Sequence, residues 1–292
     1  MNEFGQYLSC PVCEARLTGT GATVRCAQAH AFDVAREGYI NLLLANRKQP
    51  ATVGDTKEML QARRRFLERG YYQPLLEAIN RQVYAYLNQP PTAPAEAIPA
   101  GVAEIGCGEG YYIGRLKRFL DGQPEQRLNC FFGVDISKAA VRYAAKQYQD
   151  VHFILADVRQ KIYFANGALG VLLNIFAPRN AAEFGRIMAP QGLLLIVIPN
   201  ASHLLNLRTD LNLLSIEAHK QPRVIEQLSD RFKLAGEQSV EYDLRLDNQA
   251  LLDLIQMTPN YRHLSEETLA RLQDTESMLT QASFTILEFS RS

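Results

Sequence analysis

AEIGCGEGYYIGRL, residues 103–116, decides the fold class of this chain. An apolar run ends at Ile105, three alternate glycines follow it, and a helical pattern begins after the last of them. Glycine permits the tight turn that joins a strand to a helix, and it lets a ligand approach the backbone closely. The stretch therefore predicts a strand, a ligand-binding turn and a helix of a parallel α/β sheet. The three glycines are Gly106, Gly108 and Gly110.

Short apolar runs alternate with helical patterns beyond this loop. The runs CFFGVDI, VHFILAD, GVLLNIF and LLLIVIP are strand candidates, and helices are expected from Lys138 and from about Ala181. This alternation predicts right-handed βαβ units in a doubly wound parallel sheet with both faces covered. The later runs SVEYDLRL and ASFTILEFSRS predict antiparallel edge strands. A helical stretch is expected between them, at about residues 250–282.

A second motif lies near the N-terminus, in LSCPVCEARLTGTGATVRCAQAH, residues 8–30. It reads C-x2-C, then 12 residues, then C-x3-H, a spacing that suits a tetrahedral zinc site of the Cys₃His type. Four protein ligands leave no open position, so we expect a structural ion that stabilises a segment too short to build its own core. The remaining cysteines, Cys107 and Cys130, lie in apolar contexts and are interpreted as packing residues. The predicted ligands are Cys10, Cys13, Cys26 and His30.

These patterns divide the chain of 292 residues into unequal parts. We expect a small zinc-binding domain over residues 1–46, a flexible linker over 47–56, and a large domain over 57–292. The large domain begins with two helices joined by a turn at Gly70.

The composition is that of an ordinary globular protein, with 47% apolar and 21% charged residues. Basic and acidic residues both number 31, so a polyanion would have to be met by a local basic surface. The N-terminus lacks a secretory signal, and no run reaches the roughly 18 apolar residues of a membrane span. We expect a cytoplasmic protein without a membrane partner.

Acidic residues stand at the ends of three predicted strands. Glu104 opens the glycine loop, Asp135 is placed to bind ribose hydroxyls, and Asp157 is placed to bind an adenine amino group. A dinucleotide-dependent dehydrogenase also uses glycines and an acidic ribose partner, but it must bind a pyrophosphate. Carboxylates such as Glu104 and Glu109 would repel pyrophosphate, whereas they are acceptable beside a sulfonium. The pattern therefore favours S-adenosylmethionine (SAM), and with it a methyltransferase, over a nicotinamide cofactor.

The first 70 residues carry a local excess of basic side chains, ten Lys or Arg against seven Asp or Glu. Arg63, Arg64 and Arg65 cannot all share one helix face. At least one is expected to pair with an acidic residue, and the others are expected to face RNA phosphates. A solvated helix face is the alternative interpretation.

Several motifs occur together in one order over nearly the whole chain. The zinc spacing, AFDVAREGYINLL, QARRRFLERGYYQPL, EIGCGEGYY, VDISK, APQG and IQMTP resemble the RlmA family of bacterial 23S rRNA (guanine-N1)-methyltransferases. The resemblance implies a class I, Rossmann-like SAM-dependent methyltransferase domain behind a small N-terminal zinc-binding domain. It also implies a homodimer that methylates guanine N1 in a hairpin loop of domain II of 23S rRNA, with the zinc module helping to recognise the RNA. Of the two target positions in the family, 745 is preferred here over 748.

Carried over motif by motif, the resemblance implies the same four zinc ligands and SAM contacts from Tyr72, Gly108, Glu109 and His203. Considered alone, Tyr72 would be a packing aromatic at a helix start, and His203 would be a surface loop histidine. The run ALGVLLNIFAP departs from the family pattern, because Asn174 stands where a basic residue is expected.

Guanine N1 carries a proton at neutral pH, so methylation requires an in-line approach and the loss of that proton. No residue of the sequence is identified as the base. Phe176 is a candidate platform on which a flipped or unpaired guanine stacks, and Asn174 is a candidate hydrogen-bond partner of that base. Core packing and strand capping are the respective alternatives. Two other functions stay open, a small-molecule SAM-dependent methyltransferase and a zinc-dependent RNA-binding protein with an inactive core.

Overall fold

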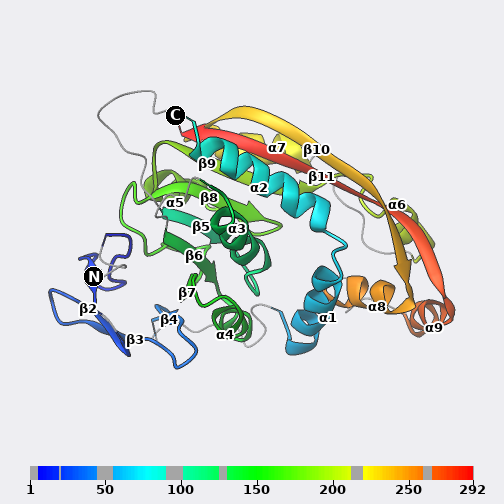
Figure 1. Ribbon diagram of the computed structural model, residues 1–292, viewed down its shortest axis with the longest axis horizontal. Helices are drawn as coiled ribbons and strands as arrows, with labels where there is room; N and C mark the ends of the chain where they lie inside the picture. The colour runs from blue at the N-terminus through cyan, green and yellow to red at the C-terminus, as the bar shows by residue number, and fades with distance from the viewer. Residues whose placement is uncertain are drawn as a thin grey trace.

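The computed structural model describes residues 6–19, 21–44, 55–89, 101–124, 130–211, 220–258 and 265–291. Within these residues an eight-stranded sheet has the order β10-β11-β9-β8-β5-β6-β7-β4 (Figure 1). The strands from β9 to β4 in this order are parallel, and β11 and β10 add antiparallel to them and to each other. The strands are β4 (Ile40–Asn41), β5 (Gly101–Ile105), β6 (Cys130–Asp135), β7 (His152–Leu155), β8 (Leu169–Ile175), β9 (Met188–Pro199), β10 (Phe232–Asp247) and β11 (Ser277–Arg291).

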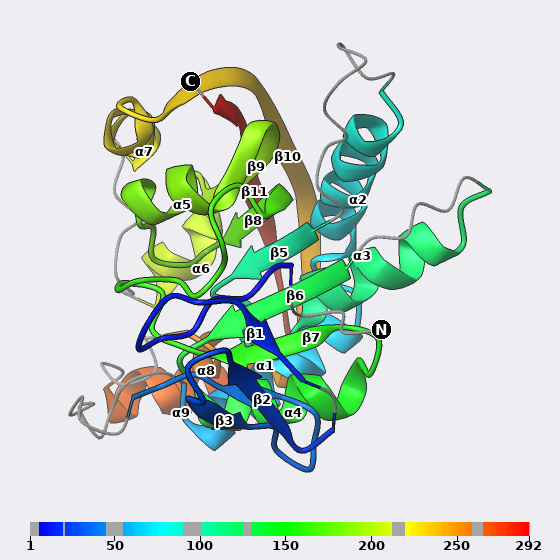
Figure 2. The same ribbon diagram turned by 90° about the vertical axis from the view of Figure 1, so that its left-hand side faces the viewer.

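Helices cover both faces of this sheet, which confirms the doubly wound architecture (Figure 2). One face carries α2 (Gln73–Leu87), α3 (Tyr111–Asp121) and α4 (Lys138–Gln147). The other face carries α5 (Ala181–Ile187) and α7 (Lys220–Leu228). The chain runs outward from β5 to β7 and then returns to the other side of β5 with β8 and β9. This reversal creates a switch point between β5 and β8, where ligands of doubly wound sheets bind.

The N-terminal module, residues 6–44, covers a part of the sheet that has no helix of its own. The connection from β7 to β8 contains no helix, and the module packs there (Figure 2). Leu8 forms a β-bridge with Phe164, and the rings of Tyr7 and Phe132 lie 5.0 Å apart. The module has its own small sheet, made of β1 (Leu17–Thr18), β2 (Thr23–Cys26) and β3 (Ala31–Asp33). The buried apolar side chains of the module and those on this face of the large sheet form one core.

The last strand of the module also joins the large sheet. Ile40 of β4 pairs in parallel with Ile154 of β7, and β4 forms the edge of the sheet. This strand is not predicted from the sequence. The predicted boundary at residue 46 stays a prediction, and residues 47–54 of the predicted linker lie outside the described residues.

The structure contains the two helices that the sequence predicts before β5, within the described residues 55–89. α1 (Lys57–Glu68) is capped by Thr56, whose side chain accepts a hydrogen bond from Met59 N. A turn containing Gly70, with φ of +81°, joins α1 to α2.

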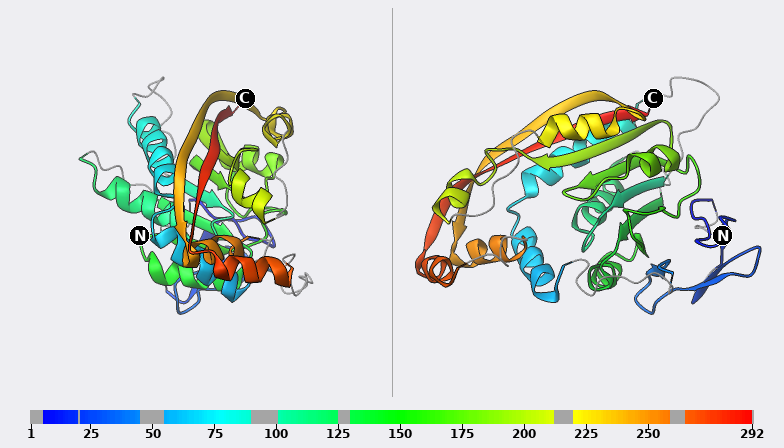
Figure 3. Two further views of the ribbon diagram at one scale, coloured as in Figure 1. Left: turned by 90° about the vertical axis from the view of Figure 1, so that its right-hand side faces the viewer. Right: turned by 180° about the vertical axis from the view of Figure 1, so that it is seen from behind.

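Strands β10 and β11 form a long hairpin that arches away from the sheet and carries two helices at its far end (Figures 1 and 3). These helices are α8 (Asn248–Gln256) and α9 (Glu266–Asp274). The helical stretch predicted to reach residue 282 ends earlier, because β11 begins at Ser277 and pairs along β10. The hairpin brings α8 against α1, so these two helices lie opposite the carboxyl ends of the parallel strands. Over the described part of the chain, every helix is too short or too polar to cross a membrane.

Candidate functional site

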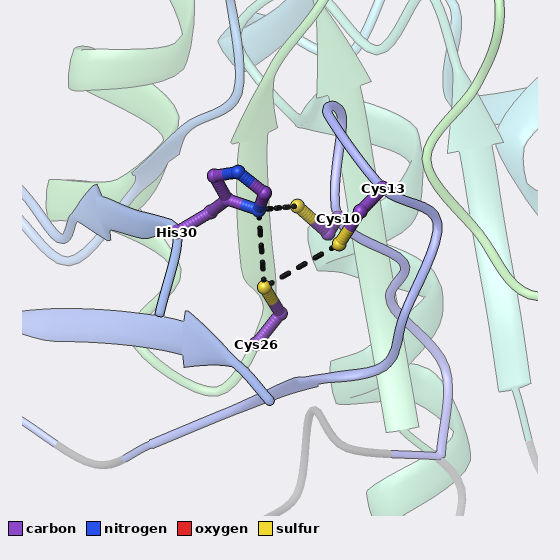
Figure 4. Close-up of side chains that lie close together, drawn as sticks. All are labelled: Cys10, Cys13, Cys26 and His30. Carbon is purple, nitrogen blue, oxygen red and sulfur yellow. Dashed lines mark hydrogen bonds between the residues drawn. The ribbon is translucent and has the colours of Figure 1, made fainter. Parts of the chain in front are cut away.

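The structure brings the four predicted metal ligands together (Figure 4). Their donor atoms all lie within 4.8 Å of one another. The Sγ atoms of Cys13 and Cys26 are 3.5 Å apart, and His30 Nδ1 lies 3.4 Å from Cys26 Sγ and 3.7 Å from Cys10 Sγ. Tetrahedral zinc with its usual bond lengths would separate such donors by about 3.5–3.8 Å. The donor set therefore fits a structural zinc ion of the Cys₃His type.

Local backbone geometry holds these ligands in place. Val12 N donates to Cys10 Sγ at 3.4 Å, so the first pair forms a tight knuckle. Between Cys26 and His30 the chain turns through Ala29, whose φ is +63°, and Ala29 N donates to Cys26 O. Short turns thus aim all four donors at one point, which is what the paired spacings of the sequence indicate.

A cavity of about 780 Å³ opens at the switch point of the large sheet. It is lined by the loops after β5, β6, β7 and β8, by the end of β9, and by α1 and α8 on the opposite side. Sites for ligands the size of a nucleoside typically have volumes of about 300–1,000 Å³. The predicted site residues that line it are Tyr72, Glu104, Gly106, Gly108, Glu109, Asp135, Asp157, Phe176 and His203, together with Arg63.

The glycine loop forms the floor of this cavity. A Cβ on Gly106 would lie only 2.3 Å from Ala177 Cβ, and the residue has a φ of +83°, so no other residue type fits there. Gly110 is the residue before α3 and also has a positive φ, but it is not among the residues lining the cavity. The loop is thus shaped by close backbone packing against the end of β8.

Two carboxylates accept hydrogen bonds from the backbone of the glycine loop and of the helix that follows it. Glu104 is buried, and its side chain accepts a hydrogen bond from Ile113 N at the start of α3, at 3.0 Å. Burial raises the pKa of Glu104. Asp135 accepts hydrogen bonds from Gly108 N and Ser137 N, both at 2.8 Å, and burial raises its pKa as well. Glu104 therefore braces the loop, while Asp135 stands at the end of β6 between the loop and the cavity.

Glu109 and Asp157 differ in their surroundings. Burial raises the pKa of Glu109 to about 7, and the nearby Arg63 and Arg64 oppose that shift. Asp157 lies two residues beyond the end of β7, where its carboxylate accepts hydrogen bonds from Arg159 N and Gln160 Nε2. The oxygens of Asp157 are thus already engaged by its own loop.

Tyr72 and His203 meet inside the cavity, although 131 positions separate them in the sequence. Tyr72 is the residue before α2, and its hydroxyl lies 3.3 Å from His203 Nε2. Ser283 N donates to His203 Nδ1 at 3.1 Å, so the histidine proton sits on Nε2. Burial, with the charges of Arg208 and Lys220, lowers the pKa of His203 to about 3. Tyr72 is also a packing aromatic at a helix start, as its interpretation from the sequence alone expected, because its ring lies 5.1 Å from Phe66 and 5.0 Å from Phe284 in the buried core. The interpretation of His203 as a surface loop histidine is wrong, because the residue is only 7% exposed.

Phe176 and Asn174 lie close in sequence but take different places. Phe176 is 43% exposed, lines the cavity and has a φ of +54°, a conformation that costs energy for a bulky residue. Asn174 is completely buried and is not a lining residue. Its Nδ2 donates to Ile105 O and Pro178 O, both at 3.0 Å. The structure thus favours the strand-capping alternative for Asn174 over contact with a target base.

The three consecutive arginines of α1 pair with acidic groups of the chain itself. Arg63 pairs with Asp55, Arg64 with Glu68, and Arg65 with Asp253 of α8. Arg64 also lies over the Tyr143 ring, 4.7 Å from its centre. The expected pairing of at least one of these arginines with an acidic residue is therefore present, and Arg63 and Arg65 tie α1 to neighbouring elements. Contact of the run with RNA phosphates stays a prediction.

Several cavity residues were not identified from the sequence. Tyr112 of α3 is buried, and its hydroxyl has no hydrogen-bond partner among the described residues. Phe284 of β11 packs between Phe176 and His203, with ring centres 5.4 and 4.5 Å away. Arg208 and Lys220 bring positive charge to the side of the cavity beyond β9. Tyr112 follows the glycine loop in the sequence, whereas no sequence signal marks Phe284, Arg208 or Lys220, which join the cavity only through the fold.

The chain is similar to known proteins over most of its length. Residues 8–50 match the family profile of a zinc ribbon described as "RlmA, N-terminal". A protein of Streptomyces fradiae named 23S rRNA (guanine(748)-N(1))-methyltransferase is 37% identical over 91% of this chain and 89% of its own length. A candidate 23S rRNA (guanine-N(1)-)-methyltransferase of Micromonospora griseorubida is 34% identical over 88% and 87%. Another candidate of the same name, from Bacillus subtilis (strain 168), is 29% identical over 92% and 91%.

Proposed function

Because this chain belongs to the RlmA family of 23S rRNA (guanine-N1)-methyltransferases, we propose that its cavity brings SAM and one guanine of 23S rRNA together. The observation that carries this proposal is the extent of the cavity, which runs from the glycine loop to the exposed ring of Phe176. One end is suited to the methyl donor and the other end to a base.

The glycine loop and the ends of β5 and β6 would hold the donor. Gly106 and Gly108 permit close approach of the backbone, and Asp135 is placed to accept hydrogen bonds from ribose hydroxyls. Glu109, Asp157, Tyr72 and His203 line the same cavity. When bound, SAM supplies a methyl group on a positively charged sulfur. Carboxylates in this part of the cavity favour that charge.

The exposed ring of Phe176 would receive the target base. A guanine extruded from an RNA loop loses its stacking partners, and an aromatic side chain replaces them. The positive φ of Phe176 keeps its ring out of the core, with the rings of Tyr72 and Phe284 behind it. We propose that Asn174 acts through the backbone, because its amide fixes the carbonyls of Ile105 and Pro178 on either side of the site.

The proposed substrate is a hairpin loop in domain II of 23S rRNA. The zinc module would help to recognise this RNA, and the enzyme would act as a homodimer in the cytoplasm. Among the charged side chains of α1, Arg64 is half-buried, and its ion pair among the described residues is with Glu68 of its own helix, at 3.6 Å. It is therefore the residue of the run that fits a phosphate best.

The test is methylation of 23S rRNA from a strain that lacks the corresponding gene. Labelled methyl groups from SAM should enter the RNA, and primer extension should stop at one guanine, because an N1 methyl group blocks Watson–Crick pairing. The position of the stop separates nucleotide 745, which is preferred from the sequence, from nucleotide 748, which is in the name of the Streptomyces fradiae relative.

Two outcomes would refute the proposed function. Label that enters a metabolite extract but not RNA would indicate a small-molecule methyltransferase. RNA binding without heat of SAM binding in calorimetry would indicate an RNA-binding protein with an inactive core. Size-exclusion chromatography with light scattering tests the homodimer separately.

A further inference from the structure

The carboxylates among the described lining residues of the cavity all lie in one of its two halves, which also holds Arg63 and Arg159. The half bounded by α1 and by the ends of β5, β6 and β7 contributes every carboxylate among the described lining residues, namely Asp55, Glu104, Glu109, Asp135 and Asp157. The other half is bounded by the ends of β8 and β9, by α6 (Leu205–Asp210), by the start of α7 and by β11. Its charged side chains within the described ranges are Arg208 and Lys220. Such an arrangement would favour a cationic methyl donor in the half with the carboxylates and an electron-rich acceptor in the half with Arg208 and Lys220.

Arg208 has an unusual environment for a guanidinium. It is only 9% exposed, one Nη donates to Ala201 O, and Nε has no hydrogen-bond partner among the described residues. No described carboxylate forms an ion pair with it, whereas the other cavity arginines, Arg63 and Arg159, pair with Asp55 and Asp157. A buried charge without a counter-charge destabilises the fold. Its presence points to a ligand that carries or develops negative charge in this half of the cavity.

This half of the cavity also lacks a proton acceptor among the described side chains. His203 Nδ1 already accepts from Ser283 N, and its Nε2 carries a proton beside the Tyr72 hydroxyl. Guanine N1 must nevertheless lose its proton to be methylated. The negative charge left on the base is shared between N1 and O6, and O6 is an acceptor that arginine commonly binds. A guanidinium at O6 would therefore make the loss of the proton easier without a protein base.

We propose that Arg208 donates hydrogen bonds to O6 of the target guanine and stabilises the negative charge that forms as N1 loses its proton to water. This inference rests on the proposed function. The N1–H bond breaks, and its electron pair stays on the base. That pair forms the N1–C bond while the C–S bond of the donor breaks, with its electrons remaining on sulfur. The products are a neutral methylated guanine, a neutral thioether and one released proton.

The test compares wild type, R208Q and R208K in single-turnover methylation of the rRNA hairpin across a range of pH. R208Q should be about 100-fold slower at neutral pH, as for loss of one donor to a developing oxyanion. This deficit should shrink as the pH approaches the range in which guanine N1 ionises in water. R208K keeps the charge without the planar fork, so its deficit should be smaller and follow the same pH trend. SAM affinity and RNA affinity should be unchanged in both variants.

Controls separate this inference from other roles of the residue. R245Q removes an exposed arginine of β10 and should keep the wild-type pH profile. Thermal unfolding shows whether each variant is folded. If R208Q does not fold, wild type is compared with R208K alone. A deficit that is constant with pH, with weaker RNA binding and a salt slope lower by about one, would mean a phosphate contact and overturn the inference. Weaker SAM binding, or no deficit at all, would overturn it too. If wild type itself does not methylate the RNA, the proposed function fails instead.

Discussion

Removal of the metal is expected to destabilise the whole chain and not only its N-terminal module. The module covers the face of the sheet where the connection between β7 and β8 has no helix. Tyr7 and Leu8 are 3% and 0% exposed, and they contact Phe132 and Phe164 of the large domain. Without metal the ligand turns lose the interaction that fixes them, so this apolar contact should open to water.

The size of the effect follows from the two side chains at the junction. Complete burial of a large apolar side chain stabilises by about 1.5–3 kcal/mol, so Tyr7 and Leu8 together contribute about 3–6 kcal/mol. Domains are stable by only about 5–15 kcal/mol in total. Loss of this contact should therefore lower the midpoint of the main unfolding transition on the order of 10 °C.

The assay is differential scanning calorimetry of the reduced protein with and without a chelator, with metal content measured by mass spectrometry. Leu8→Ala with metal bound should lower the free energy of unfolding in the same transition by about 2–5 kcal/mol. Leu279→Ala is the matched control, because Leu279 is 57% exposed on β11 and should change stability by less than about 0.5 kcal/mol. If chelation produces a separate low-temperature transition and leaves the main one unmoved, the shared core inferred here is wrong.

Three further predictions concern the cavity. Gly106→Ala should abolish SAM binding in calorimetry and cost several kcal/mol of stability, because its Cβ would meet Ala177. Gly21→Ala is the control: Gly21 has a similar φ of +87° but lies in open space, so this variant should cost only about 1–2 kcal/mol. Asp135→Asn should weaken SAM binding by about 1.5–3 kcal/mol, or roughly 10–150-fold, and an unchanged affinity would place the ribose elsewhere. Burial raises the pKa of Glu109 from 4.5 to about 7, so the protonated form favours folding. That stabilisation is complete below pH 4.5 and is lost as the pH rises through 7. Urea unfolding of wild type relative to Glu109→Gln should therefore lose about 2–3 kcal/mol between about pH 5 and pH 8, and parallel pH profiles would contradict this.

The central sheet could be predicted because its signals are local. Each of the strands from β5 to β9 is an apolar run that a helical pattern follows or precedes, and the glycine loop fixes where the first of them ends. β4 escaped prediction because two residues, Ile40 and Asn41, carry too short a pattern and depend on β7 for their pairing. The end of the last predicted helix was misplaced because the polar start of β11 is paired with β10 in the arching hairpin, outside the core pattern.

The metal ligands could also be predicted, since short spacings along the chain bring them together. The cavity could be predicted in its cofactor half and at Phe176 after β8, where the residues lie at or just after strand ends that the sequence marks. Tyr72, His203 and Phe284 converge from three distant segments, and only the family resemblance indicated the first two. Arg208 was missed because nothing in HLLNLRTD shows that its guanidinium is buried.

The arginine run of α1 shows how the same limit affects an electrostatic interpretation. Three adjacent arginines in a locally basic segment predict attraction to phosphate, because the sequence shows the charges but not their partners. The partner of Arg65 is Asp253, 188 positions later, and the pair forms only because the hairpin of β10 and β11 returns α8 to α1. Asp253 is completely buried, so removal of Arg65 would leave an uncompensated charge at the junction of the two helices. A loss of methylation in an Arg65 variant is therefore expected to come from displacement of α8 over the cavity, and not from a lost contact with RNA. SAM affinity measured without RNA separates the two causes, because a lost RNA contact would leave it unchanged.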